Sequence, residues 1–181
     1  MRIILTEEEM ALMADYAKRF YEHKGEQTSK KKQFYQGDDP LYPDKKGFTA
    51  EFAVHKFFGV EMPDFNPEYT KKDMLLGYKG KELVCDIKST IYSRKDEGGY
   101  YKALTINEGV YNSNLREKEI DAFIGVEVWK DLTTVELHGI ISWENFLKHK
   151  ERFEFNNGGY APCVPITELM LLSKDFTYLE S

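Results

Sequence analysis

Lys79 and Gly80 separate two stretches, residues 73–78 and 81–88, in which apolar and polar side chains alternate. Alternation with a period of two is typical of β-strands. A two-residue connection that ends in glycine favours a tight turn between antiparallel strands. The sequence therefore predicts a β-hairpin, and the length of its turn determines which residues are opposed.

The predicted register collects charged side chains on one face of the hairpin. Residues equally distant from the turn are directly opposed, which pairs Asp73 with Asp86, and their Cβ atoms are then about 5 Å apart. Lys88 lies two residues beyond Asp86 and points to the same face, about 6.7 Å along the strand. The other face of the second strand is apolar and consists of Leu83, Cys85 and Ile87. We therefore expect the core on one face and two carboxylates with an ammonium on the other.

Such a group of side chains has a chemical use. Two opposed carboxylates repel each other, and a divalent cation between them turns this cost into binding. Mg²⁺ takes oxygen ligands, often one or two carboxylates together with waters and a substrate phosphate. Lys88 could orient a metal-bound water or stabilise charge on the phosphate. These are the groups that hydrolysis of a phosphodiester requires.

A helix is expected just before the hairpin, from about Thr49 to Phe58, because apolar residues recur there at helical spacing. Gly59 suits the left-handed position that follows a helix end. Glu51 lies at the margin of the apolar stripe, where a carboxylate needs a partner.

The remaining pattern predicts one mixed α/β domain with a central sheet. Thr6 and Glu9 form a capping box for an amphipathic helix over residues 7–24. Strands are expected at 100–106, 121–129 and 134–140, and helices at 107–118, 143–149 and 166–172. We divide the chain into an N-terminal helix with a basic loop, residues 1–46, and a core, residues 47–181. Within that loop, Lys30, Lys31 and Lys32 could follow phosphates or could simply be solvated, and Lys102 on the third strand could contact nucleic acid.

The combination of Glu51 on a helix, Asp73 on one strand and Asp86-Ile87-Lys88 on the next resembles the PD-(D/E)xK nuclease superfamily, over about residues 47–128. The resemblance implies a restriction-endonuclease-like core of a helix, a three-stranded meander, a helix and a further strand. It also implies that Asp73 and Asp86 bind the metal, that the Ile87 carbonyl adds a ligand, that Lys88 is the catalytic lysine and that Glu51 completes the site. The chain departs from the motif at Lys72, where the pattern has proline.

Composition limits these interpretations. Hydrophobic residues make up 41% and charged residues 31%, which is enough for one core and a polar surface. The net charge of −6 argues against tight, non-specific duplex binding, although it does not exclude DNA. Two cysteines are too few for a disulfide scaffold or a zinc site. The short, acidic N-terminus and the absence of an apolar run of about 20 residues predict a cytoplasmic protein.

The sequence thus predicts a Mg²⁺- or Mn²⁺-dependent endonuclease acting on DNA, with RNA left open as a substrate. Its small size and acidity suggest a structure-selective or partner-delivered enzyme of a phage or mobile element, working as a homodimer or within a larger nuclease assembly. The alternative is a catalytically silent domain of the same fold that binds DNA or protein as an inhibitor or scaffold.

Overall fold

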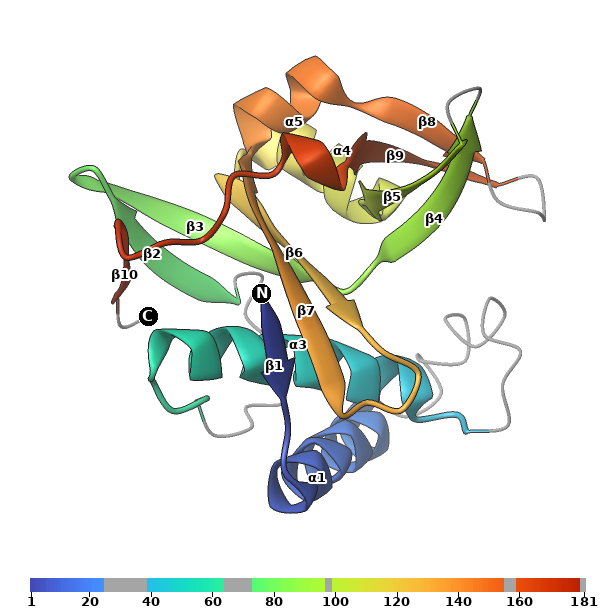
Figure 1. Cartoon of the computed structure of the whole chain (residues 1–181), viewed down its shortest axis with the longest axis vertical. Helices are drawn as coiled ribbons and strands as arrows, with labels where there is room; N and C mark the ends of the chain where they lie inside the picture. Colours follow the sequence, from blue (N-terminus) through green and yellow to red (C-terminus); the bar gives the residue numbers. More distant parts are fainter. Residues whose placement is uncertain (25–38, 64–72, 97–98, 155–158, 180–181) are drawn as a thin grey trace. The chain divides into compact units, whose positions relative to one another are not determined.

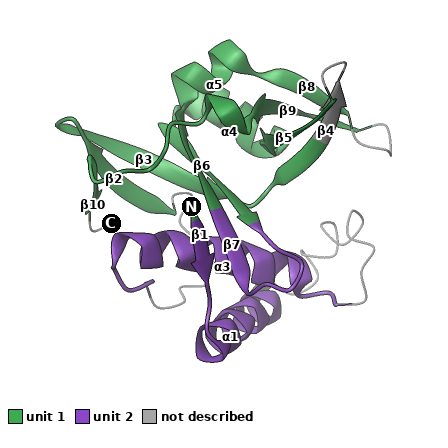
Figure 2. Cartoon of the chain, viewed as in Figure 1, with its two compact units in different colours: residues 1, 71–127, 137–181 green, residues 2–70, 128–136 purple. Residues whose placement is uncertain are grey.

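The computed structural model describes residues 1–24, 39–63, 73–96, 99–154 and 159–179 (Figure 1). The chain forms two compact units that alternate along the sequence (Figure 2). Unit 1 comprises residues 1, 71–127 and 137–181, and unit 2 comprises residues 2–70 and 128–136. These boundaries differ from the predicted division after residue 46. Among the described residues, no helix has both the length and the hydropathy that crossing a bilayer requires.

Unit 2 contains helices α1 (Glu7–Lys24) and α3 (Tyr42–Phe58) and strand β1 (Arg2–Ile4), which pairs with the start of β7 (Thr134–Ser142). The capping box of α1 is confirmed: the Glu9 amide donates to the Thr6 hydroxyl, and the Thr6 amide donates to the Glu9 carboxylate. The two helices share a core of Met13, Tyr16, Ala17, Phe20 and Phe48.

Helix α3 begins at Tyr42, seven residues before the predicted start at Thr49. Pro43 stands in its first turn, where proline is favoured because its missing N–H would have no partner in the helix. The predicted loop over residues 25–46 is therefore wrong at its C-terminal end. The predicted helix end is correct, because Gly59 adopts the left-handed conformation with φ of 69°.

The first sheet of unit 1 has the strand order β7-β6-β3-β2-β10. Its strands besides β7 are β2 (Met74–Tyr78), β3 (Lys81–Lys88), β6 (Ala122–Val128) and β10 (Phe176–Leu179). β3 is antiparallel to β2 and parallel to β6. The fold is therefore α/β with a mixed sheet, as predicted.

The second sheet of unit 1 has the order β4-β5-β9-β8. Its strands are β4 (Ile91–Asp96), β5 (Gly99–Thr105), β8 (Glu151–Glu154) and β9 (Tyr160–Pro165). β5 corresponds to the third predicted strand, but it pairs with β4 and β9. The expected three-stranded meander is therefore wrong, because β4, which the sequence did not predict, forms a separate hairpin with β5.

Two capped helices and a short 3₁₀ helix complete unit 1. Asn107 caps α4 (Glu108–Glu117), and Ser142 caps α5 (Trp143–His149). These two helices match those expected at 107–118 and 143–149. The predicted helix at 166–172 is only the 3₁₀ turn η2 (Ile166–Glu168), because the chain becomes extended at Leu169 and Met170 bridges to Ile140. The core here consists of Ile91, Leu104, Ile106, Ile120, Phe123, Ile141, Phe146, Val164 and Leu169.

Candidate functional site

The β2–β3 hairpin has the predicted register. Lys79 and Gly80 are the two turn residues, with φ of 49° and 75°, and Met74 pairs with Cys85 at the far end of the ladder. Positive φ at both central residues is the conformation of the type I′ turn, whose twist matches that of a hairpin. The turn therefore determines which side chains of β2 and β3 share a face.

Asp73 lies one residue beyond the last ladder pair and adopts a bend. Its amide donates to the Cys85 carbonyl over 3.1 Å, so the regular pairing stops at Met74. Its carboxylate oxygen Oδ2 instead accepts the backbone N–H of Ile87 at 2.6 Å. The Asp73 side chain thus takes the place of a backbone partner and is held against the end of β3.

Asp86 and Lys88 complete this cluster. The Lys88 ammonium lies 2.6 Å from Asp86 Oδ1, and Asp86 is only 3% exposed. Burial raises the pKa of Asp86 to about 7, the Lys88 ammonium opposes that rise, and the Asp73 carboxylate, which shares a hydrogen bond with Asp86, adds to it. The structure therefore brings Asp73, Asp86 and Lys88 together, with Asp86 far more buried than a solvent-facing hairpin residue.

Cys85 lies on the opposite face of β3 and is fully buried. Burial and the nearby carboxylates of Asp121, Asp73 and Asp86 raise the pKa of its thiol to about 12. A thiol that holds its proton so firmly is a poor nucleophile. The chemistry of this region therefore depends on the carboxylates and the ammonium.

A second charged group lies on the same face of the sheet. Lys88 is opposed by Gly125 on β6, and Glu127 follows two residues later, so its side chain points to the same side. Oxygen Oε2 of Glu127 lies 2.5 Å from the Lys102 ammonium and 3.0 Å from Nε2 of His138. Three strands of unit 1 thus supply an ammonium and an imidazole that both contact one carboxylate.

The predicted site residues did not include Glu127 and His138. Glu127 is the one charged residue in the apolar run of β6, and such an interruption of a buried strand is a signal that it needs partners. His138 has no metal-binding spacing to other histidines, and its contact with Glu127 follows from the pairing of β6 with β7, which are consecutive in the chain.

The other predicted site residues are distributed as follows. Glu51 lies on α3 in unit 2, and its backbone carbonyl accepts the Nδ1 hydrogen of His55 at 2.9 Å. Lys102 bonds to Glu127, and its contact with nucleic acid stays a prediction. Lys30, Lys31 and Lys32 lie outside the described residues.

No family model, curated protein or solved structure matches this chain.

Proposed function

We propose that the chain is a Mg²⁺- or Mn²⁺-dependent nuclease that hydrolyses phosphodiester bonds of DNA. The observation that carries the proposal is the contact of the Asp73 and Asp86 carboxylates beside the Lys88 ammonium. The proposal uses residues of unit 1 alone, and Glu51 is not required for it.

The donor set suits a hard divalent cation. Two carboxylates in contact at a buried position disfavour each other's charge, and this repulsion contributes to the raised pKa of Asp86. A cation bound by both would remove that penalty, and oxygen ligands are those that Mg²⁺ and Mn²⁺ prefer. Asp73 and Asp86 would hold the ion, with the carbonyl of Ile87 as a further ligand. Such an ion would activate a water and stabilise the charge of the phosphate.

Lys88 has the position of a group that acts on the phosphate. Its side chain is partly exposed and is fixed by Asp86, so the ammonium stays next to the carboxylate pair. An ammonium held in this way stabilises negative charge that develops on phosphate oxygens during attack by water. The charge of Asp86 keeps Lys88 in place, and the Lys88 ammonium in turn reduces the free-energy cost of burying the Asp86 carboxylate.

The decisive experiment compares the wild-type protein with Lys88→Ala on supercoiled, linear, branched and single-stranded DNA, and on RNA, with Mg²⁺ or Mn²⁺. We expect cleavage of at least one DNA substrate, and a loss of roughly a hundredfold or more in Lys88→Ala. Lys81→Ala is the matched control, because Lys81 is an exposed lysine at the other end of the same strand. Equal cleavage by wild type and Lys88→Ala, or no metal-dependent cleavage of any substrate, would overturn the proposal.

The burial of Asp86 supports a second candidate function, a catalytically silent domain that binds DNA or protein. A carboxyl that is 3% exposed and bonded to a lysine can serve as a structural ion pair. Titration with Mn²⁺ separates the two candidates. The nuclease requires a binding event that Asp86→Asn abolishes, whereas the silent domain requires none.

A further inference from the structure

Unit 2 presents a tryptophan, Trp129, on the turn that follows β6 and leads into β7. The Trp129 amide donates to the Thr134 carbonyl, and the Leu132 amide donates to the Trp129 carbonyl, both over 2.9 Å. Within the turn, the Asp131 carboxylate accepts the amide of Thr133 at 3.0 Å and its hydroxyl at 2.8 Å. These bonds fix the turn, and with it the backbone that carries the indole.

A planar cation lies over the indole ring. The Cζ atom of Arg2 is 4.9 Å from the centroid of the Trp129 ring, within the range of a cation–π contact. The guanidinium has a second partner, since its Nη2 atom lies 2.7 Å from Oε1 of Glu136. Because the ring is held in this way before any ligand binds, a ligand that packs against it would lose little free energy in ordering it.

The indole is part of an exposed row on one face of the sheet. Ile4 on β1 is opposed to Thr134 on β7, and the Trp129–Thr134 hydrogen bond places Trp129 on the other side of Thr134. Directly opposed residues of antiparallel strands point to the same face. Ile4 is 67% exposed and Trp129 is 42% exposed. Large apolar side chains exposed next to each other mark a binding surface.

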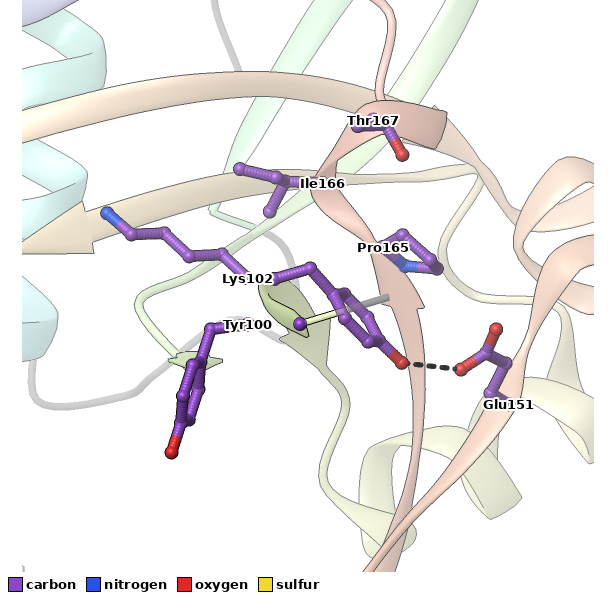
Figure 3. A pocket seen from close by; sticks show the side chains of 8 residues that line it. Tyr100, Lys102, Glu151, Pro165, Ile166 and Thr167 are labelled. Atoms are coloured by element: carbon purple, nitrogen blue, oxygen red, sulfur yellow. Dashed lines mark hydrogen bonds between the residues drawn. The ribbon is translucent and has the colours of Figure 1, made fainter. Parts of the chain in front are cut away.

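Exposure of an aromatic ring is not enough to define such a surface, as unit 1 shows. Tyr100 is 79% exposed and borders a hollow of about 540 Å³ (Figure 3). Side chains alternate along β5, so Tyr100 and Tyr101 point to opposite faces, and Figure 3 shows Tyr100 directed away from Glu151. One planar ligand therefore cannot contact both rings. Trp129 differs because its planar cation and its apolar neighbour Ile4 lie on the same face as the ring.

The chemistry around Trp129 suits a nucleobase. Bases stack on tryptophan rings and on guanidinium planes, and the contact tolerates any sequence because every base has a π-face. The Arg2 side chain is 56% exposed, and Lys130, the residue after Trp129, is exposed as well. Cations therefore flank the ring, and the phosphates of a bound strand carry the complementary charge.

We propose that Trp129 stacks on one unpaired nucleobase of a nucleic-acid strand. Arg2 holds the indole in place, and Ile4 extends the apolar surface beside the base. This inference rests on the proposed nuclease function, and it assigns to the enzyme a substrate with a single-stranded segment. It requires no particular base.

The first test uses the fluorescence of Trp129 itself. The chain has two tryptophans, so Trp129 is the only one left in a Lys88→Ala, Trp143→Phe protein, which also lacks the proposed catalytic lysine. With Mg²⁺ present, this protein is titrated with a short thymidine oligomer, an abasic oligomer of equal length and a duplex whose ends are closed by hairpin linkers. We expect saturable quenching by the thymidine oligomer and little quenching by the other two, because neither offers an unpaired base.

The second test measures affinity by fluorescence anisotropy of the labelled thymidine oligomer in the Lys88→Ala background. Trp129→Ala should weaken binding by roughly tenfold or more, whereas Trp129→Phe keeps an aromatic ring and should lose much less. Leu12→Ala is the matched control in unit 2, because Leu12 is 41% exposed and lies on α1. Tyr100→Ala removes a more exposed ring from unit 1, and both controls should leave the affinity unchanged. Melting temperatures check that each variant is folded.

The inference is overturned if the abasic oligomer quenches Trp129 as strongly as the thymidine oligomer, if Trp129→Ala binds like Leu12→Ala, or if no oligomer binds. Its failure is distinguishable from failure of the nuclease proposal. Base-dependent quenching without cleavage by the wild-type protein sustains this site and removes the catalytic role, whereas cleavage without base-dependent quenching does the reverse.

Discussion

Asp86 is the residue on which the electrostatics of the cluster depend. A charged carboxylate inside a sheet is costly unless a partner compensates for its lost hydration. The Lys88 ammonium at 2.6 Å supplies that compensation, while the Asp73 carboxylate works against it. The result is a group that holds its proton at a pH at which an ordinary aspartic acid has lost it.

This shift predicts how stability depends on pH. The pKa of Asp86 rises from 3.8 to about 7 on folding, so between these values the folded protein binds more protons than the unfolded chain. The free energy of unfolding of the metal-free protein should therefore fall as pH rises from about 4 to about 7 and then level off. Asp86→Asn is neutral at every pH and should remove this part of the slope, which urea unfolding at a series of pH values measures.

Asp121→Asn serves as the control for this experiment, because Asp121 is a carboxylate of the same region that bonds to the Val84 amide. That variant should retain the wild-type slope between pH 4 and 7. A wild-type slope that survives in Asp86→Asn would show that other groups cause it.

The position of the turn was enough to predict the cluster of Asp73, Asp86 and Lys88. The register follows from the length of the turn alone, so Asp73, Asp86 and Lys88 could be placed together from local sequence. The bend at Asp73 and the burial of Asp86 could not, because they depend on how the end of β3 is covered. Glu127 and His138 lie on the consecutive strands β6 and β7, so the pairing of these two strands is enough to bring them together. The contact of Glu127 with Lys102 was not predictable from local sequence, because β5 belongs to the other sheet.

At the scale of secondary-structure elements, the sequence predicted helix ends and turns correctly where a capping or turn residue marks them. The capping box of α1 and the Ser142 cap of α5 are side-chain features that the sequence displays. β4 was missed because its polar residues gave it the composition of a loop, and only pairing with β5 makes it a strand. The early start of α3 was missed because Pro43 was interpreted as part of a loop, although proline in the first turn favours a helix.

Gly139 determines whether β7 can form its bridge to Met170. Gly139 has φ of 146°, and a Cβ atom there would lie 2.4 Å from the Met170 carbonyl oxygen. That oxygen accepts the Ile140 amide at 2.8 Å, so it cannot move without loss of the bridge. Gly139→Ala should therefore destabilise the fold by more than about 2 kcal/mol, as measured by chemical denaturation.

Gly77→Ala is the matched control for this prediction. Gly77 is also a strand glycine of unit 1, but its φ is not positive, and an added Cβ would meet Leu179 Cδ2 at an ordinary 3.6 Å. This variant should be neutral or slightly stabilising, because alanine restricts the unfolded chain. Equal denaturation midpoints for the two variants would contradict the steric argument.

At the scale of the whole molecule, the strand order was the least predictable feature. Sequence order suggested that the third strand continues the hairpin, whereas the other side of β3 pairs with β6. In this register Cys85 is opposed by Ala122, which lies 37 residues later in the chain (122 − 85). Local sequence does not predict a pairing of this kind, because the pairing is stabilised by burial of residues such as Phe123 and Ile124. The fold class was predictable from composition and pattern, and the partition into two sheets was not.

The net charge of −6 leads to the last prediction, which concerns how nucleic acid binds. A protein that contacts about six to ten phosphates loses roughly 10³–10⁵ in affinity between 50 and 200 mM salt, because bound counterions are released. An acidic chain that binds DNA through a cation held by Asp73 and Asp86 releases few counterions. Its affinity for DNA should therefore fall by only about tenfold over the same range. Anisotropy titrations of Lys88→Ala at several salt concentrations measure the slope, and a steep slope would mean that lysines, not the cation, supply most of the affinity.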